Sequence, residues 1–322
     1  MNRLRTYITR RLIHAVIVLF IVSVLIFSIM RLLPGDPILL YLSQSANLEN
    51  MNQEMIDALT KKHGLDQPLP VQYFRWLTNI FRGDWGRSIF YNEDIGQLML
   101  ERFPVTLHLS LTSVIVSTIL GILIGLVAAV KRGKLVDKLI MPLTYLGISA
   151  PVFWVCVMLM YVFGVELDLL PIAGYTSPFK DFWFSVKQSI MPITCMAIFG
   201  IAGCARQMRS SVLEVLPQDY IRTAWSKGLK ERQIVIKHVL KNSLSPVVTF
   251  LGVIFKNVIG GSVLVETIFA IPGVGRLLVS SIFAHDYVVV QSITFVIALL
   301  VLLVNIIVDL SYGWLDPRVR FE

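Results

Sequence analysis

The sequence predicts an all-α membrane protein with about six transmembrane helices, and three observations lead to this fold class. Hydrophobic residues make up 55% of the 322-residue chain and charged residues 16%, whereas soluble domains carry about 25% charged residues. Six apolar stretches approach or exceed the roughly 20 residues that a helix needs to cross the hydrocarbon core. Lys and Arg gather at one set of ends of these stretches, which is how membrane topology is set. The stretches are Leu12–Met30, Leu107–Val130, Leu139–Val165, Ile190–Ala205, Val247–Val265 and Val288–Leu310.

The Lys and Arg count orients the predicted spans. Eighteen of these residues lie in the N-terminus, the second-to-third connection, the fourth-to-fifth connection and the tail. The opposite side has three in its short connections and seven in the long segment 31–102. Charges in loops longer than about 60 residues count little toward orientation. Both termini are therefore expected in the cytoplasm, and the net charge of +8 is explained by topology, without a nucleic-acid partner.

Residues 1–31 are predicted to form a cytoplasmic N-terminus and the first transmembrane helix. The apolar run is longer than the hydrophobic region of an ordinary signal peptide, and it ends in SIMRLLPGDP without a small-x-small cleavage site. An external segment follows over 32–103. Apolar side chains recur at helical spacing within it over Val71–Phe81. We interpret this segment both as a cap over helix ends and as a docking surface for an external partner.

The other five predicted spans form a core over 104–322. GISAPVFW (Gly147–Trp154) is the clearest candidate for a kink, because a proline leaves helix carbonyls without their usual partner. The fourth stretch is the shortest, and its Gly200 and Gly203 would allow close contacts between helices. The external stretch Glu266–Asp286 is interrupted by IPGVG, and we expect a short helix after this break, in a re-entrant hairpin.

Sequence motifs of several enzyme classes are missing. The chain has no G-x-x-x-x-G-K-[ST], no H-E-x-x-H and no G-x-S-x-G, which argues against an ATP site, a metalloprotease and a serine hydrolase. The five histidines and three cysteines show no metal-ligand spacing. We therefore expect no catalytic residue, no metal site and no cofactor in this chain.

The polar segment 206–245 is the most informative part of the sequence. It carries eight Lys and Arg residues and helical patterning, although a loop joining two spans needs only a few residues. Asp219 is predicted to cap a helix, Gly228 to end it, and a second helix to run to about Ser245, before Pro246. Small and apolar side chains are predicted to form one continuous face of the first helix. That face consists of Tyr220, Ala224 and Gly228 beside Ile221, Trp225 and Leu229, with Arg222, Lys227 and Lys230 towards the other sides.

This pattern indicates a docking element for a cytoplasmic protein, and the alternative is a helix that lies flat on anionic lipid. TAWSKGLKERQIVIKHVLKNSLSP resembles the cytoplasmic loop of ABC importer permeases, in the version found in peptide and nickel importers. Ser226 stands where that version usually has Ala, and Trp225 where Arg is common. The matching positions are Arg222, Thr223, Ala224, Lys227, Gly228, Leu229, His238, Leu240, Asn242, Leu244 and Pro246.

Further resemblances cover nearly the whole chain. RRLIHAVIVLFIVSVLIFSIMRLLPGDP is similar to the N-terminal span of the same family, and GLDQPLPVQYFRWLTNIFRGDWGRSI to its external segment. GGSVLVETIFAIPGVGRLLVSSIFAHDYVVVQ and NIIVDLSYGWLDPRVR resemble its C-terminal third. Together they identify the chain as a member of the B-type permeases of the dipeptide, oligopeptide and nickel group.

The resemblance implies a type I ABC importer permease, a multi-pass protein of the cytoplasmic membrane and a non-catalytic subunit. In that family the permease forms a heterodimer with a second related permease, and an external substrate-binding protein delivers the substrate. Two ATPase subunits, which hold ATP and Mg, bind beneath. The residues expected to couple this chain to an ATPase are Asp219, Tyr220, Arg222, Thr223, Ala224, Trp225, Lys227, Gly228 and Leu229.

Small peptides are the expected substrate, with nickel or a metal chelate as the alternative. Lys256 lies about 15 Å into the fifth span at 1.5 Å per residue, where an ionisable group should face the bundle or a watery cavity. It is expected either to attract a substrate carboxylate or to pair with an acidic residue of the partner permease. Glu266, near the outer end of that span, is expected to orient a peptide amine, coordinate a metal chelate or cap a helix.

A self-contained secondary transporter is the less favoured alternative function. Such proteins often show inverted repeats and acidic residues within their spans. This sequence has no clear internal repeat, and its spans are poor in carboxylates. Asp309, near the inner end of the sixth span, is expected to hold the C-terminal tail.

Overall fold

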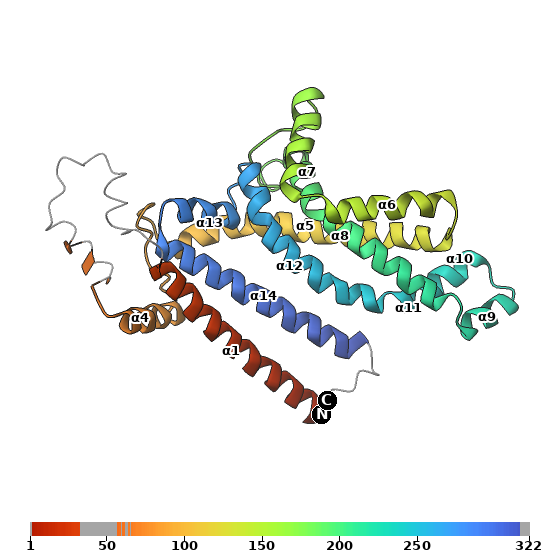
Figure 1. Ribbon diagram of the computed structural model, residues 1–322, viewed down its shortest axis with the longest axis horizontal. Helices are drawn as coiled ribbons and strands as arrows, with labels where there is room; N and C mark the ends of the chain where they lie inside the picture. Colours follow the sequence, from red (N-terminus) through yellow and green to blue (C-terminus); the bar gives the residue numbers. More distant parts are fainter. Residues whose placement is uncertain (1, 33–56, 59, 62–63, 65, 316–322) are drawn as a thin grey trace.

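The computed structural model describes residues 2–32, 57–58, 60–61, 64 and 66–315. Within these ranges every regular element is a helix (Figure 1). Five helices are long and apolar enough to cross a membrane, which confirms the first, second, fourth, fifth and sixth predicted spans. They are α1 (Asn2–Leu32), α5 (Ile95–Val130), α8 (Phe182–Val215), α12 (Ser245–Ile268) and α14 (Tyr287–Leu315).

The third predicted span is broken rather than straight. α6 (Leu135–Ser149) is followed by α7 (Val152–Leu159) and a π-helical continuation, η2 (Met160–Glu166), and the two halves meet at an angle of 106°. Ala150 between them has an extended backbone (φ −69°, ψ 127°), because the ring of a following proline, here Pro151, disfavours the helical conformation. The kink predicted at GISAPVFW is therefore confirmed, and it divides the predicted third span, Leu139–Val165, into two helices.

Small residues hold α5 and α8 together, and this pair makes the most extensive helix–helix contact in the described chain. A Cβ atom added to Gly121 would lie 2.5 Å from the Cβ atom of Cys204. A Cβ atom added to Gly200 would lie 2.7 Å from that of Ser117, whose hydroxyl donates to the Ala197 carbonyl at 3.1 Å. Close approach through small side chains is the usual basis of helix association in lipid.

Gly203 on α8 has a second partner. An added Cβ atom there would overlap the ring of Phe250 on α12, so α12 also packs closely on α8. The close contacts predicted at Gly200 and Gly203 are both confirmed. Helix α8 is consequently the centre of the bundle, with α5, α6, α7 and α12 against it.

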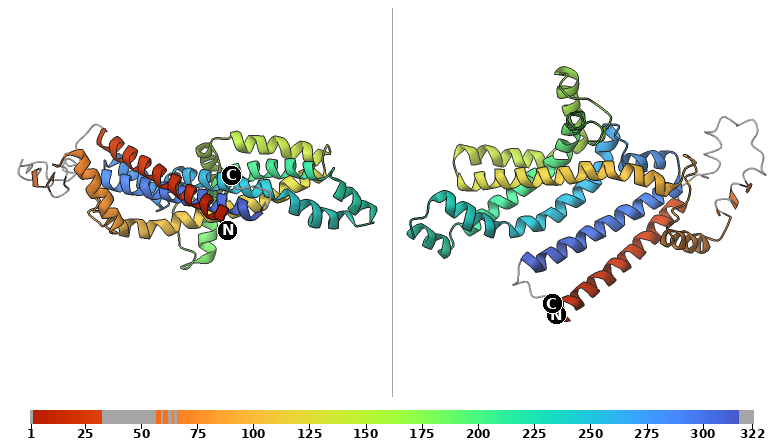
Figure 2. Two further views of the ribbon diagram at one scale, coloured as in Figure 1. Left: turned by 90° about the horizontal axis from the view of Figure 1, so that it is seen from below. Right: turned by 180° about the vertical axis from the view of Figure 1, so that it is seen from behind.

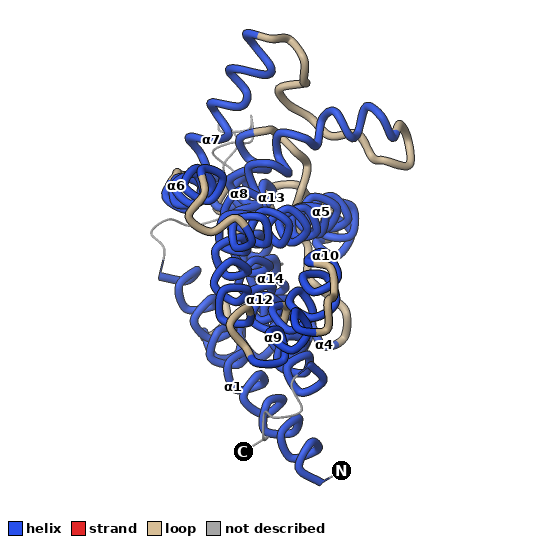
Figure 3. The backbone as a smooth tube through the Cα atoms, turned by 90° about the vertical axis from the view of Figure 1, so that its right-hand side faces the viewer, coloured by secondary structure: helices blue, strands red, loops and turns tan. Residues whose placement is uncertain are grey.

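The two remaining long helices run beside this bundle, and the short helices lie near its ends. In Figure 1, α1 and α14 run side by side, and the short helices beyond α8 lie at the end opposite to α13. The two views in Figure 2 show the same separation, and Figure 3 shows the bundle from the end that carries α9 and α10. The short helices are α4 (Leu69–Phe81), α9 (Asp219–Ser226), α10 (Glu231–Gln233), the π-helix η3 (Ile234–Leu240), α11 (Lys241–Ser243) and α13 (Val274–Phe283).

A buried carboxylate ties the segment before α5 to the start of α14. Asp286 is 1% exposed, and its Oδ2 atom accepts hydrogen bonds from the Ser88 hydroxyl and from the Phe90 backbone N–H, the latter at 3.0 Å. Tyr91 and Ser280 of α13 share a hydrogen bond of 3.0 Å between their hydroxyls. The short helix predicted after IPGVG is confirmed as α13. The hydrogen bond between Ser280 and Tyr91 holds it against the segment before α5.

Candidate functional site

The N-cap of helix α9 lies one residue earlier than the sequence predicted. Gln218 occupies the cap position with an extended backbone (φ −68°, ψ 145°), and Asp219 is the first helical residue. The capping role predicted for Asp219 is therefore wrong. Its exposed carboxylate instead lies 3.7 Å from an Arg222 Nη atom, and its place in the first turn suits the positive end of the helix dipole.

The apolar face predicted for α9 is partly covered by the rest of the chain. Ile221 is fully buried and Ala224 is 5% exposed, whereas Tyr220 and Trp225 are 45% and 48% exposed. Ile221 and Ala224 are covered by the same chain, since α9 packs on η3, so the predicted apolar face is not available to a partner as a whole. At 3.6 residues per turn the buried Ile221 and Ala224 lie between Tyr220 and Trp225 on the helix surface, so the two exposed aromatic rings flank the buried side. Arg222, Thr223 and Lys227 are also exposed.

Gly228 ends α9 as predicted. Its φ of +72° lies in the left-handed region that glycine adopts without strain. The N–H of Gly228 donates to the Trp225 carbonyl at 2.9 Å, and Leu229, which follows, is 36% exposed. The predicted second helix is present as the continuous run α10–η3–α11, and Pro246 lies in the first turn of α12.

The inner side of α9 belongs to the main hydrophobic core. Ile221 and Ala224 share one cluster of buried side chains with Val212 of α8, Ile234 of η3 and Val247 of α12. A tightly packed interior moves as a body because it has little free volume. A displacement of α9 is therefore expected to carry the adjoining ends of α8 and α12 with it.

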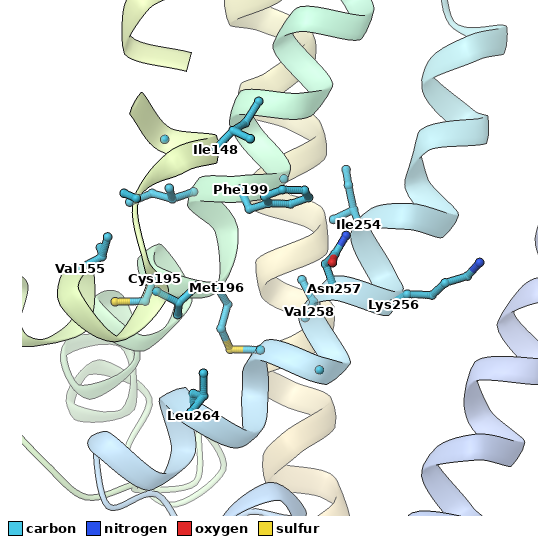
Figure 4. A pocket seen from close by; sticks show the side chains of 17 residues that line it. Ile148, Val155, Cys195, Met196, Phe199, Ile254, Lys256, Asn257, Val258 and Leu264 are labelled. Carbon is cyan, nitrogen blue, oxygen red and sulfur yellow. The ribbon is translucent and has the colours of Figure 1, made fainter. Parts of the chain in front are cut away.

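A hollow of about 380 Å³ lies between α6, α7, α8 and α12. Phe199 and Met196 of α8 point towards it, and Lys256 of α12 stands at its border (Figure 4). The Lys256 side chain is exposed and extends away from Phe199 towards α14. There it also lines a second hollow, of about 440 Å³, with His14 of α1 and Asn305 of α14. Neither hollow has a carboxylate among its lining residues.

Glu266 lies elsewhere on α12 and is fully buried. Its Oε1 atom accepts a hydrogen bond from the Thr106 hydroxyl at 2.7 Å, and its Oε2 atom accepts one from the Arg276 backbone N–H at 3.1 Å. A Cβ atom at position 273 would overlap this carboxylate, so Gly273 leaves the room that the carboxylate occupies. The geometry gives Glu266 the last of its three predicted roles, since the carboxylate caps the N-terminus of α13.

Lys256 and Glu266 are not brought together by the fold. They are ten residues apart on one helix, which separates them by about 15 Å along its axis. Glu266 lines neither of the two hollows beside Lys256. Asp309 lies within α14, but its side chain is outside the described set.

The sequence reasoning missed one ion pair between α6 and α8. Arg209 of α8 donates to both carboxylate oxygens of Asp137 in α6, at 2.7 and 2.9 Å. Asp137 also accepts from the Gly133 N–H at 3.0 Å. A single acidic residue among Lys131, Arg132, Lys134 and Lys138 was the available signal. Its partner is 72 residues away in sequence and could not be identified from the pattern.

Among the described residues, no group of three or more His, Cys, Asp or Glu side chains could hold a metal ion. The three cysteines are buried and unpaired: they are Cys156, Cys195 and Cys204.

Comparison with known families accounts for most of the chain. The family described as binding-protein-dependent transport system inner membrane component matches residues 121–321. A second family pattern, for the N-terminal part of binding-protein-dependent transport system membrane components, matches residues 4–110. The two matched ranges include every predicted span except part of the second.

Several curated proteins are similar over nearly their full length. A putative peptide transport system permease protein of Brucella abortus is 41% identical, over 98% of this chain and 99% of the relative. A probable peptide ABC transporter permease protein of Sinorhizobium fredii is 37% identical, with the same coverage. A glutathione transport system permease protein of Salmonella paratyphi A is 38% identical over 98% of this chain and 99% of the relative.

Solved structures show the same fold. One chain of the MetNI methionine ABC transporter, in an inward-facing conformation, aligns with a TM-score of 0.54 and 17% identity, over 68% of this chain and 97% of that chain. A second crystal form of the same transporter gives a TM-score of 0.57. At this identity the likeness concerns the fold alone.

Proposed function

We propose that this chain, which belongs to the family of binding-protein-dependent transport system inner membrane components, carries small peptides into the cell. The chain is a multi-pass permease of the cytoplasmic membrane with the type I ABC importer fold. The observation that carries the peptide assignment is the identity of 37–41% to full-length relatives named for peptides. A further relative is named for glutathione, which is itself a tripeptide.

This assignment is preferred to the two alternatives from the sequence. The peptide permeases match over 98% of the chain, so they favour a peptide over nickel or a metal chelate. Membership in a binding-protein-dependent family excludes the self-contained secondary transporter.

The family description implies that an external substrate-binding protein and an ATPase work with this chain. We propose the finer arrangement as a heterodimer with a second, related permease above two ATPase subunits. The chain itself then performs no catalysis. ATP and Mg are held by the ATPase subunits, and the permease converts their closure into movement of its helices.

We propose that α9 is the coupling helix. Two exposed aromatic side chains, Tyr220 and Trp225, flank its buried side. Arg222 and Lys227 are exposed close to them, and aromatic side chains with neighbouring cations suit a groove on a partner protein. Asp219 and Thr223 of the same helix are also exposed. Its inner side, through Ile221 and Ala224, transfers the force to α8 and α12. Gly228 and Leu229 set the direction in which the chain leaves the helix.

We propose that Lys256 faces the substrate path. Its side chain is exposed at the border of two hollows whose lining residues include no carboxylate. A cation within a membrane span is costly unless a counter-charge or water compensates it. The C-terminal carboxylate of a peptide would supply that charge. An acidic residue of the second permease is the competing partner. Glu266 affects the substrate path only indirectly, by holding α13 in place.

The substrate assignment is tested by calorimetry on the external binding protein that works with this permease. Mixed di- to hexapeptides are titrated against Ni²⁺, with and without chelators. Peptide binding without a response to metal is the expected result. Binding of metal or chelate alone would overturn the peptide assignment and leave the permease assignment standing.

A further inference from the structure

A groove of about 580 Å³ runs between α1 and α4, at the end of α1 that is remote from the chain terminus (Figure 1). Tyr73 of α4 anchors this crossing, because its hydroxyl lies 2.8 Å from that of Ser23 and its ring packs edge-on against Phe27. Both rings are buried beneath the groove. The groove is therefore a defined feature of a packed contact between two helices. Its lining residues are Phe20, Val24, Phe27, Ser28, Arg31, Leu32, Leu69, Pro70, Tyr73 and Phe74.

The walls of the groove are apolar and exposed. Phe20 and Leu32 of α1 are 54% and 82% exposed, and Phe74 of α4 is 62% exposed. The face of α1 that leads into the groove is also apolar and exposed along its length. Because α1 crosses the membrane, this face contacts acyl chains. The groove continues that lipid-facing surface and has the chemistry to hold one acyl chain.

A single cation lines the groove. The Arg31 guanidinium lies over the Phe27 ring, at 5.2 Å from its centre. Its Nε–H is buried and has no hydrogen-bond partner among the described residues, and no carboxylate in those ranges forms an ion pair with it. A buried donor without a partner costs free energy, so the site is suited to a ligand with an anionic oxygen.

The neighbouring charge has the same sign. Arg75 and Arg82 line a second hollow on α4, which shares Pro70 and Phe74 with the groove. Helix α4 has no acidic residue, and neither hollow is lined by one. The surroundings therefore favour a ligand with net negative charge over a zwitterion.

We infer that the α1–α4 groove binds one phospholipid with an anionic headgroup, with its phosphate on Arg31 and an acyl chain along Phe20, Val24 and Phe74. Arginine suits this contact because its planar guanidinium donates two parallel hydrogen bonds to phosphate oxygens. The lipid fills the gap between α1 and α4 and holds α4 at the membrane surface. By the Lys and Arg distribution, this is the outer leaflet. The site is independent of the transported substrate.

The test uses the complete transporter complex in vesicles that contain phosphatidylglycerol with a photoactivatable acyl chain. After illumination, labelled peptides are identified by mass spectrometry. Labelling is expected to concentrate in segments 20–32 and 69–74. Excess unlabelled phosphatidylglycerol is expected to compete at least about tenfold better than phosphatidylethanolamine.

Variants separate the charge from the groove. Arg31→Gln is expected to reduce labelling of these segments about tenfold, the loss expected for one charge-assisted contact. Ser28→Phe, which fills the groove without changing charge, is expected to reduce it as well. Arg132→Gln removes an exposed arginine from the loop between α5 and α6 and should leave labelling unchanged.

Three results would overturn the inference. They are labelling spread evenly over the membrane-facing helices of the unaltered complex, equal competition by the two lipids, and unchanged labelling in both Arg31→Gln and Ser28→Phe. The lipid-competition measurement requires no variant, so the inference can be rejected even if a substitution prevents assembly.

Discussion

At the scale of single residues, the packing of this permease depends on positions where no side chain is allowed. A Cβ atom added to Gly125 of α5 would overlap the Ala205 carbonyl oxygen of α8, which is backbone and cannot move aside. Gly260 of α12 has no atom within 4 Å of the corresponding position. Gly125 therefore has no room for a side chain, because the backbone of α8 lies opposite it. Gly260 has room for one, because no atom lies opposite it.

We predict that Gly125→Ala destabilises the complex by about 1–3 kcal/mol, the usual cost of overpacking a close contact. Gly260→Ala, the matched control, should leave the thermal midpoint unchanged. Thermal unfolding of the purified complex, followed by its helical circular dichroism, measures both. Equal midpoints for the two variants would contradict the packing described for α5 and α8.

Lys256 gives a second prediction at this scale. Lys256→Gln is expected to raise the KM for uptake of peptides with a free C-terminal carboxylate about tenfold, a loss of about 1.4 kcal/mol. Peptides amidated at the C-terminus should be unaffected, because they lack the charge that Lys256 attracts. Uptake into vesicles that contain the full complex measures both constants.

Lys187→Gln is the control for this experiment, since Lys187 is exposed on α8 and lines neither hollow near Lys256. An equal effect on both kinds of peptide would contradict the role in substrate recognition. Loss of the second permease from the purified complex would identify Lys256 as a pairing residue instead.

At the scale of elements, the helix ends are where this fold is specified. Helix α13 has no side-chain cap of its own, and Glu266 supplies one from α12. Thr106 extends the same contact to α5, because its hydroxyl donates to Glu266 and accepts from the Val274 N–H at 2.9 Å. One buried carboxylate thus joins α5, α12 and α13.

We predict that Glu266→Ala lowers the stability of the complex by about 1–3 kcal/mol, because the amides of the first turn of α13 lose their acceptor. Glu266→Gln keeps an oxygen acceptor, so the stability of its complex should lie between those of the unaltered complex and of Glu266→Ala. The KM for peptides with a free amine and for N-acetylated peptides should change equally, or not at all. A rise in KM for free-amine peptides alone, in a complex of normal stability, would show that Glu266 contacts substrate.

At the scale of the whole molecule, the long apolar helices could be predicted from the sequence, because about 20 apolar residues in a row have few other uses. The position of the bend at Ala150–Pro151 could be predicted from the sequence. Its angle of 106° could not, since the angle depends on how α7 packs on α8. Gly228 could be predicted as the end of α9, because its left-handed backbone is a local property. The pairing of Asp137 with Arg209 could not, since it depends on which helices become neighbours.

The coupling surface shows the same limit. Helical spacing placed Ile221 and Trp225 on one face of α9, and the structure buries the first and exposes the second. Sequence alone does not say which part of an apolar face the rest of the chain covers. That choice follows from the position of η3, which packs against Ile221.

The central claim is that ATPase movement reaches the substrate path through α9, and one measurement tests it most directly. Peptide-stimulated ATP hydrolysis and peptide uptake are measured in the same vesicles, with the complete complex and its external binding protein. The unaltered complex should couple the two. Trp225→Ala should assemble with an unchanged thermal midpoint, because Trp225 is 48% exposed, and should lose at least about tenfold of both activities. Full coupling in Trp225→Ala, or peptide uptake without ATP, would contradict the account.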